Sequence, residues 1–597
     1  MAAVETSNAA ADGQSGAPAA PAGEHISKNN GNRGNRGGRD RGNDKGHKKR
    51  KHSGFGSAKG DVPDKREQIQ NNRNAKRRRV IDEENDGNSY MSISFTPEEI
   101  AAEERRPKRK VAVLIGYAGT GYHGIQINHK EKTIEGDIFA AFVAAGAISK
   151  ANADDPKKSS LVRCARTDKG VHAAGNVLSL KLIVEDEDIV DKINQHLPEQ
   201  IRIWGIQRTS NGFSCYQACD SRWYEYLMPS YSLLPPQPHS FLGKKLADSA
   251  KEKGVYDEYV ERLDDVKHFW EEVEKNDIQP ILEKLTPEVR AEVLRKIHDT
   301  ADQELTEEGV PTKPDADVVA PAETEKPKEA ESAPSTSEGA PMSDADAKAK
   351  PERELTLVEQ AVRELKAAYV SAKRRYRVTP ARVEKLQQAL NLYLGTRNYH
   401  NYTVMKSHSD PSAKRHIKSF QVNPTPIQIG DTEWLSLKVH GQSFMMHQIR
   451  KMVAMAVMVV RCGAPLDTIL QSYGPRRISI PKAPGLGLML ERPMFTEYNK
   501  KAKGLGRDPI DFAKYEDKIA EFKDKHIYRR MFELEEKENS FHLFFNQVDN
   551  FRTDYFLWVT AGGVEASHER SDRTEKVPKA LQAELGDDAD GVVEVGT

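Results

Sequence analysis

Residues 163–175 read Arg-Cys-Ala-Arg-Thr-Asp-Lys-Gly-Val-His-Ala-Ala-Gly. This stretch places the carboxylate of Asp168 at a Gly-closed turn between two apolar, strand-like runs, 161–162 and 177–184. Arg166 precedes Asp168 by two residues, so in an extended chain both side chains leave the same face. An arginine beside an aspartate stabilises the ionised carboxylate. Asp168 is therefore a candidate nucleophile or base, although Asp-Lys-Gly is also an ordinary turn sequence.

The run A-R-T-D-K-G-V-H-A at 165–173 resembles the active-site signature of the TruA-type tRNA pseudouridine synthases. The resemblance implies that Asp168 is the essential catalytic residue and that Arg166 is its companion at the site. It also implies an isomerase that converts uridine in tRNA to pseudouridine without a cofactor. His172 has no part in that chemistry, and we predict a structural role for it.

The segment 441–452 reads Gly-Gln-Ser-Phe-Met-Met-His-Gln-Ile-Arg-Lys-Met and opens an apolar run that predicts a helix over 444–461. Arg450 lies among apolar neighbours near the start of this helix. Because an unpaired buried charge is costly, Arg450 must contact an anion, and Asp168 is the obvious candidate. The segment also resembles the family element S-F-x-x-x-Q-I-R-K-M-V, whose arginine pairs with the catalytic aspartate.

The segment 221–226 reads Ser-Arg-Trp-Tyr-Glu-Tyr and alternates as a strand does. It resembles the family's R-x-Y-x-Y strand, whose first tyrosine stacks on the target base, which implies that Tyr224 binds the substrate. By position alone, a tyrosine on a sheet surface would simply pack. Arg222 could pair with a phosphate of the RNA or with Glu225, and the sequence leaves both alternatives open.

Three further segments resemble the family in the expected order: 117–126, 394–402 and 484–488. The long basic N-terminus, the acidic insertion and the extra C-terminal residues resemble the eukaryotic branch of the family. The resemblance further implies that Arg166 fills the place that the flipped uridine vacates. Cationic side chains around the site would contact RNA; we single out Lys169, Arg222, Lys414, Arg415, Lys418 and Lys451.

The 597 residues are 30% charged and 37% hydrophobic, which is a low apolar share for one globular body. The zero net charge conceals strong segregation. Residues 33–79 hold 17 Lys/Arg against 5 Asp/Glu, whereas residues 301–350 hold 13 Asp/Glu against 5 Lys. Such segments bury too little apolar surface to offset chain entropy, so we expect them to be disordered.

Strands and helices alternate over 110–229 in the order expected of a ferredoxin-like unit. We predict an α+β pseudouridine synthase fold in which two ferredoxin-like halves form a mixed sheet with a central cleft. The predicted segments are a disordered basic tail (1–107), an N-terminal catalytic half (108–235), a helical insertion (236–300), a disordered acidic linker (301–352), a C-terminal catalytic half (353–497), a C-terminal extension (498–565) and a disordered acidic tail (566–597).

The four cysteines do not form a disulfide framework and suit a reducing compartment. Cys215 and Cys219 lack a second Cys/His pair at finger-like spacing, so we predict no metal site, while the sequence leaves a structural zinc at this pair open. No apolar run reaches the roughly 18 residues that a membrane span needs, and we expect no membrane partner.

The basic clusters at 48–51 and 76–79 predict import into the nucleus by an import receptor. The expected partner is tRNA; small nuclear and messenger RNAs stay open as further substrates. Bacterial relatives are dimers, but the insertion would obstruct that arrangement and favours a monomer. Two rival functions remain: an RNA-binding protein or chaperone without catalysis, and a glycosylase-like hydrolase that would release free uracil.

Overall fold

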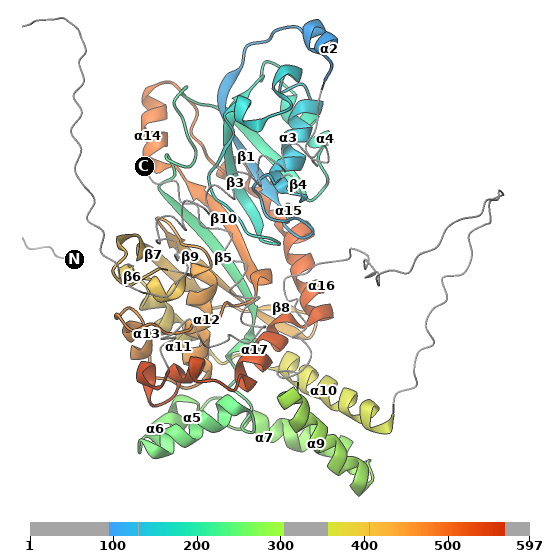
Figure 1. Ribbon diagram of the computed structural model, residues 1–597, viewed down its shortest axis with the longest axis vertical. Helices are drawn as coiled ribbons and strands as arrows, with labels where there is room; N and C mark the ends of the chain where they lie inside the picture. Colours follow the sequence, from blue (N-terminus) through green and yellow to red (C-terminus); the bar gives the residue numbers. More distant parts are fainter. Residues whose placement is uncertain (1–94, 129–130, 304–355, 405, 568–597) are drawn as a thin grey trace, which may run out of the picture. The chain divides into compact units, whose positions relative to one another are not determined.

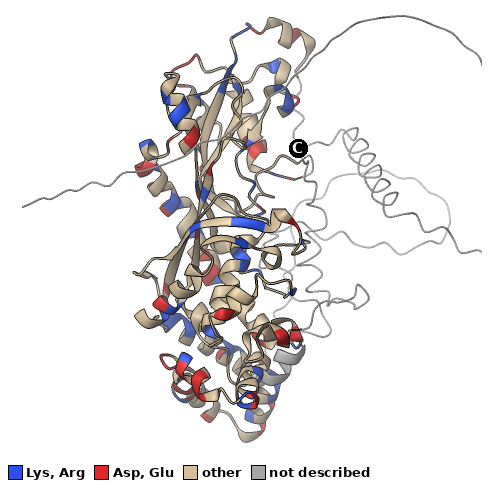
Figure 2. Cartoon of the chain, turned by 90° about the vertical axis from the view of Figure 1, so that its left-hand side faces the viewer, with Lys and Arg blue, Asp and Glu red and all other residues tan. Residues whose placement is uncertain are grey.

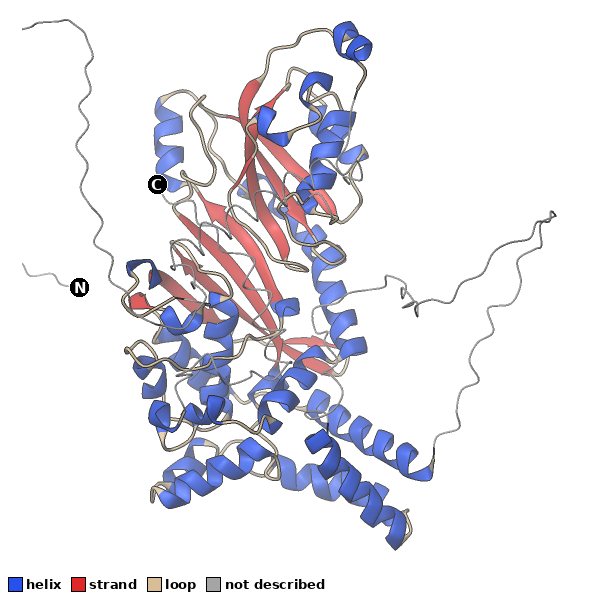
Figure 3. Ribbon diagram, viewed as in Figure 1, coloured by secondary structure: helices blue, strands red, loops and turns tan. Residues whose placement is uncertain are grey.

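The computed structural model of the chain describes residues 95–128, 131–303, 356–404 and 406–567, which form a 10-stranded sheet with flanking helices (Figures 1 and 3). This confirms the predicted α+β class. Most of the predicted acidic linker and most of both predicted tails lie outside the described residues. Within the predicted basic tail, Pro97–Ala102 form helix α2, which corrects the prediction there. A capping box between Thr96 and Glu99, followed by Pro97 at the first helical position, favours this helix.

The first half of the sheet has the strand order β4-β1-β3-β2, the order expected of the predicted ferredoxin-like unit. Its helices follow β1 and β3 in the chain. Thr133 caps the first of them through a hydrogen bond from the Gly136 N–H to its hydroxyl, as predicted. The elements are β1 (Arg109–Tyr117), α3 (Ile134–Ala144), β2 (Val162–Arg163), β3 (His172–Leu182), α4 (Ile189–Gln195) and β4 (Ile201–Arg208).

The second half repeats this order as β10-β5-β9-β7. The order of the chain predicts that β5 belongs to the N-terminal half, because β5 follows β4 directly. In the sheet β5 pairs with β9 and β10, so it is the first strand of the second half. The elements are β5 (Ser221–Pro229), α11 (Pro380–Asn391), β6 (Gly395–Asn398), β7 (Lys414–Val422), β8 (Ile427–Ile429), β9 (Thr432–Gly441), α12 (Gln448–Arg461) and β10 (Leu488–Met494).

The two halves meet where β3 lies parallel to β10. His172 pairs with Met489 and Ala173 with Leu490, and the other strand pairs of the described sheet are antiparallel. We call this contact the seam. His172 closely follows the Asp168 turn, so the seam places the motif of residues 163–175 at the junction of the two halves (Figure 1).

Helix α12 begins at Gln448, four residues later than predicted. His447 has φ of 57°, a left-handed backbone that cannot continue a right-handed helix. Phe444 instead packs edge-on against Tyr224, with ring centroids 5.3 Å apart. Residues 444–447 are therefore a loop, which packs on the sheet through Phe444.

The insertion is helical, as predicted, and is fixed to the second half by a buried ion pair. Arg382 of α11 donates two hydrogen bonds to Asp265, at 2.8 and 2.9 Å, and Thr379 donates a third. Burial alone would raise the pKa of Asp265, but these partners lower it to about 2. No helix within the described ranges has the length and apolar character to cross a bilayer. The insertion helices are α5 (Phe241–Glu252), α6 (Tyr256–Arg262), α7 (Phe269–Val273), α8 (Gln279–Glu283) and α9 (Pro287–Gln303). Helix α10 (Leu357–Arg375), which begins the predicted C-terminal half, shares a small apolar core with α7, α8 and α9.

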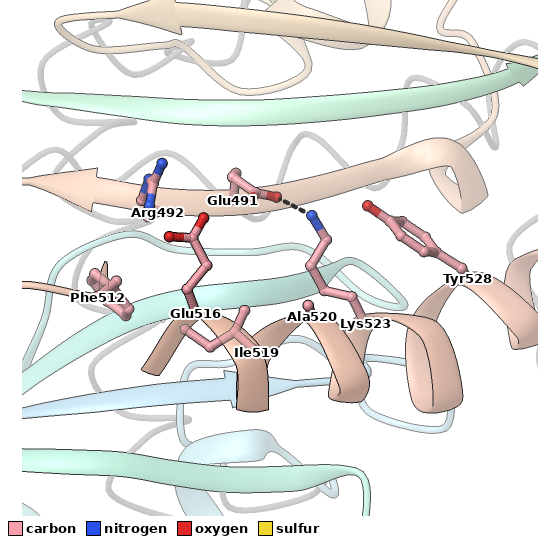
Figure 4. A pocket seen from close by; sticks show the side chains of 8 residues that line it. All are labelled: Glu491, Arg492, Phe512, Glu516, Ile519, Ala520, Lys523 and Tyr528. Carbon is pink, nitrogen blue, oxygen red and sulfur yellow. Dashed lines mark hydrogen bonds and ion pairs between the residues drawn. The ribbon is translucent and has the colours of Figure 1, made fainter. Parts of the chain in front are cut away.

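The C-terminal extension packs against both halves of the sheet. Its helices are α14 (Thr496–Gly504), α15 (Glu516–Phe522), α16 (Arg529–Glu538) and α17 (Ser540–Asn550). On the first half, Phe522 packs edge-on against Trp204 of β4, with ring centroids 5.3 Å apart. On the second half, the Lys523 Nζ lies 2.8 Å from Glu491 of β10 and 3.4 Å from Glu225 of β5. Lys523 and Glu491 line a cavity of about 180 Å³. Figure 4 shows their side chains meeting at its wall.

A buried carboxyl joins α16 to α17 and to the segment that directly follows β5. Glu535 accepts hydrogen bonds from the Tyr231 hydroxyl at 2.7 Å and from the Phe541 N–H at 3.2 Å. Burial raises the pKa of Glu535 from 4.5 to about 7. The folded protein therefore holds this proton more tightly than the unfolded chain does.

This shift predicts a pH-dependent contribution to stability. The contribution is present below about pH 4.5 and is lost as the pH rises through about 7, at a total of about 3 kcal/mol in the free energy of unfolding. Urea unfolding of wild type and Glu535→Gln between pH 4.5 and 8 measures it, because the neutral amide cannot titrate. We expect the difference between the two proteins to change by about that amount. An identical pH slope for both would contradict the prediction.

Candidate active site

Asp168 lies in the loop 164–171 between β2 and β3, and its side chain is 50% exposed. Gly170 has φ of 75°, and the Val171 N–H donates to the Asp168 carbonyl at 3.2 Å. The predicted turn is therefore confirmed. It presents the carboxylate at the surface, whereas Thr167 before it and Val171 after the turn are buried.

A buried polar network holds the start of this loop. The Asn176 amide accepts from the Ala165 N–H at 3.3 Å and donates to the Ala165 carbonyl at 3.0 Å. It also donates to the Tyr117 hydroxyl, which lies 2.8 Å from the Thr167 hydroxyl. Burial raises the pKa of Tyr117 well above its ordinary value, so the phenol stays neutral. Buried polar groups that are all satisfied give a rigid loop.

The segment 117–126 holds the other side of the loop by backbone approach. A Cβ on Gly119 would lie 2.2 Å from the Val171 carbonyl oxygen, and one on Gly124 would lie 2.8 Å from that of Thr167. The Gly119 N–H donates to Nδ1 of His172 at 3.2 Å, which gives His172 the structural role predicted for it. Burial lowers the pKa of His172 to about 4, so the imidazole is a neutral acceptor. The glycines are therefore needed for contact between two main chains.

The Asp168 carboxylate faces His447, a residue that sequence reasoning missed. The His447 Nδ1 lies 3.7 Å from the Asp168 Oδ2, and the His447 side chain is only 11% exposed. His447 is the N-cap residue of α12, so this contact also brings Asp168 to the positive end of a 14-residue helix. The one feature of the sequence that points to a polar contact here is Gln448, a polar residue at the start of an apolar run.

Tyr224 lies on β5 and is 9% exposed. Its ring meets Phe444 edge-on. Burial raises the pKa of Tyr224 to about 12, and the Asp168 charge adds to the shift. A neutral, fixed phenol ring is suited to pack against an uncharged base.

Arg222 bridges the Asp168 loop and the loop before α12. It donates to the Cys164 carbonyl at 2.9 Å and to the Gln442 carbonyl at 3.4 Å. Glu225 is bound instead by Lys523, Ser436 and Tyr528, so the Arg222–Glu225 pairing left open by the sequence is not formed.

The two other predicted arginines lie on separate elements. Arg450 is buried in the first turn of α12 and donates to the Ala483 carbonyl at 2.6 Å; its pairing with Asp168 stays a prediction. Arg166 is exposed, and in the described part of the chain no ion pair joins it to Asp168. Burial raises the pKa of Glu135, and Arg163 and then Arg166 oppose that shift.

The predicted RNA-contacting cations lie on several elements. Lys169 is in the Asp168 turn, and Lys451 on α12 donates to the Thr403 carbonyl at 3.3 Å. Lys414, Arg415 and Lys418 lie on β7. Figure 2 shows the lysines and arginines distributed over the helices and strands of the described chain.

The cysteines predicted not to bind metal each contact a backbone carbonyl. The Cys215 thiol donates to Val162 at 3.2 Å, and the Cys219 thiol donates to Ser221 at 3.3 Å. Among the residues that the structure describes, no three His, Cys, Asp or Glu side chains gather as metal ligands would.

Comparison with known proteins gives one family. Residues 389–496 match the family described as tRNA pseudouridine synthase. The chain is 43% identical over 473 residues to tRNA pseudouridine synthase 1 of Candida glabrata, which covers 79% of this chain and 75% of that protein. It is 42% identical over 453 residues to tRNA pseudouridine synthase 1 of Saccharomyces cerevisiae, covering 75% and 73%. It is also 35% identical over 396 residues to tRNA pseudouridine(27/28) synthase of Saccharomyces cerevisiae, covering 66% and 86%.

The close approach of the Gly119 backbone to the Val171 carbonyl predicts that Gly119→Ala destabilises the protein. The added methyl group would collide with the Val171 carbonyl and displace the Asp168 loop, so we expect a loss of about 1–3 kcal/mol in stability. Thermal unfolding and circular dichroism measure this loss. The control is Gly212→Ala, since a Cβ there has no neighbour within 4 Å and φ is not positive. Equal stability of the two variants would refute the role of the close approach.

Proposed function

The chain belongs to the TruA-type family of tRNA pseudouridine synthases, and we propose that Asp168 is the catalytic carboxylate of this enzyme. The enzyme isomerises uridine in tRNA to pseudouridine. The observation that carries the proposal for Asp168 is its environment. A half-exposed carboxylate stands on a loop whose neighbouring residues are fixed by the Asn176 and Gly119 contacts.

The reaction breaks the bond between N1 and C1′ of uridine, turns the base and joins C5 to C1′. A uridine in folded RNA must first leave its stack to reach a protein side chain. Asp168 then acts on the ribose, either by attacking C1′ or by removing the proton from C2′. Both routes need an ionised carboxylate, and the adjacent N-terminus of α12 stabilises negative charge.

The surrounding residues have roles that follow from their chemistry. Tyr224 stacks on the flipped uracil. This role is supported by its phenol, which burial and the Asp168 charge keep neutral. Arg450 stabilises the negative charge of Asp168 from within α12. Arg166 is exposed and can enter the place that the flipped base leaves. Arg222 ties together the two loops of the site and donates to the substrate when the RNA is bound.

Lysines and arginines around the site contact the phosphates of the tRNA: Lys169, Lys451, Lys414, Arg415 and Lys418. Uridines in small nuclear or messenger RNA are further candidate substrates, because the chemistry requires only a base that can leave its stack. The insertion and the C-terminal extension enlarge the chain around both halves, and we propose that the enzyme acts as a monomer.

Removal of the carboxylate should abolish catalysis while leaving tRNA binding intact. We expect Asp168→Asn to lower pseudouridine formation at least about 10⁴-fold, the scale seen when an essential nucleophile is removed. The measurement is nucleoside analysis of digested tRNA, with filter binding of the same tRNA in parallel. Asp188→Asn, which changes an exposed carboxylate of the first half, is the control. Pseudouridine from Asp168→Asn at the wild-type rate would exclude the proposed role, and free uracil from the wild type would indicate a hydrolase.

The basic clusters at 48–51 and 76–79 support a second proposal, that an import receptor carries the enzyme into the nucleus. Replacing the eight residues of both clusters by alanine in a fluorescently tagged full-length chain should shift the protein to the cytoplasm. Replacing the lysines and arginines among residues 33–45 provides the control, because those charges are dispersed. Nuclear accumulation of the cluster variant would contradict the proposal.

A further inference from the structure

His447 has a backbone conformation that suits few residues. Its φ of 57° and ψ of 3° are left-handed, and among the described residues only two other non-glycine residues, Ser160 and Asn539, have positive φ. Glycine adopts this conformation without steric cost, and asparagine adopts it more easily than most side chains. A histidine at this position therefore has a strained backbone. Such strain suggests that the imidazole has a function that glycine or asparagine would not provide.

Hydrogen bonds on both sides fix the backbone around His447. The Met445 N–H donates to the Gln448 side chain at 2.9 Å, and the Thr403 hydroxyl donates to the Met446 carbonyl at 3.1 Å. The Lys451 N–H donates to the His447 carbonyl at 3.0 Å. The direction in which the imidazole leaves the backbone is thus determined by the surrounding fold.

The imidazole approaches Asp168 from the protein interior. Its side chain is 11% exposed, whereas that of Asp168 is 50% exposed, and the His447 Nδ1 lies 3.7 Å from the Asp168 Oδ2, within ion-pair distance. His447 thus contacts one carboxylate oxygen from the buried side, while half of the Asp168 side chain stays open to a substrate. With so little exposed surface, the imidazole is badly placed to reach the ribose or the base itself.

We propose that His447 is a positioning residue that fixes the orientation of the Asp168 carboxylate through the Nδ1–Oδ2 contact. This inference rests on the proposed function, because the orientation of Asp168 matters only if its carboxylate reacts with the ribose. A carboxylate on a turn can rotate about two side-chain bonds, and reaction requires one aligned orientation. The imidazole selects that orientation before the RNA binds.

The test compares His447→Gly with His447→Asn in the full-length chain. Both residues tolerate the left-handed backbone, but glycine removes the contact while the asparagine amide nitrogen lies about where Nδ1 was. We expect His447→Gly to lower the single-turnover rate constant about 10- to 100-fold, with little change in the Kd for tRNA. His447→Asn should recover most of the rate, and added imidazole should partly rescue His447→Gly.

Two results would overturn the proposal: a wild-type rate for His447→Gly, or a His447→Asn rate as low as that of His447→Gly at equal thermal stability. If His447→Gly does not fold, His447→Gln replaces it, since the glutamine amide reaches toward the Nε2 position instead. His447→Asn must then be the faster of the two, and equal rates overturn the proposal. The variant Asp168→Asn distinguishes a failure of the proposed function from a failure of the proposed role of His447. Activity in Asp168→Asn would disprove the proposed function. If Asp168→Asn is inactive but His447→Gly has a wild-type rate, only the proposed role of His447 is disproved.

Discussion

The parallel pairing of β3 with β10 is the constraint on which the site depends. Only two residue pairs form this seam, His172 with Met489 and Ala173 with Leu490. The carboxylate of Asp168 comes from the first half of the sheet, whereas Tyr224 and His447 come from the second half. The alignment of the two halves therefore sets the geometry of the site, and a shift along the seam would separate residues that must act together.

Two sets of contacts outside the strands reinforce this short seam. On the side of the site, Arg222 joins the Asp168 loop to the loop before α12 through two carbonyl groups. The C-terminal extension reaches both halves, with Phe522 against Trp204 and Lys523 between Glu225 and Glu491. Each ion pair there is shielded from water, so removing one partner would leave a buried charge. The extension thus compensates for a sheet junction with few hydrogen bonds.

The sequence indicated those parts of the fold and of the site that depend on local chemistry. The Asp168 turn, the Thr133 cap and the insertion helices follow from turn residues, capping residues and periodicity. The parts that depend on distant contacts could not be read in this way. The apolar run 444–447 has helical spacing, but packing of Phe444 on Tyr224 overrides that preference. The contact of His447 with Asp168 joins residues far apart in the chain, and no local pattern encodes it.

The seam also has a consequence for synthesis of the chain. The strands β1 to β4 are complete once residue 208 has been made, but β3 meets its partner only when Met489 appears, 317 residues after His172 (489 − 172). At about 5–20 residues per second, roughly 15–60 s pass before the ribosome supplies that partner. During this interval the edge of β3 beside the nascent Asp168 loop lacks its neighbour, and an uncovered strand edge can pair with another chain. The chain therefore passes through a stage of its synthesis in which this edge is open to pairing with another chain.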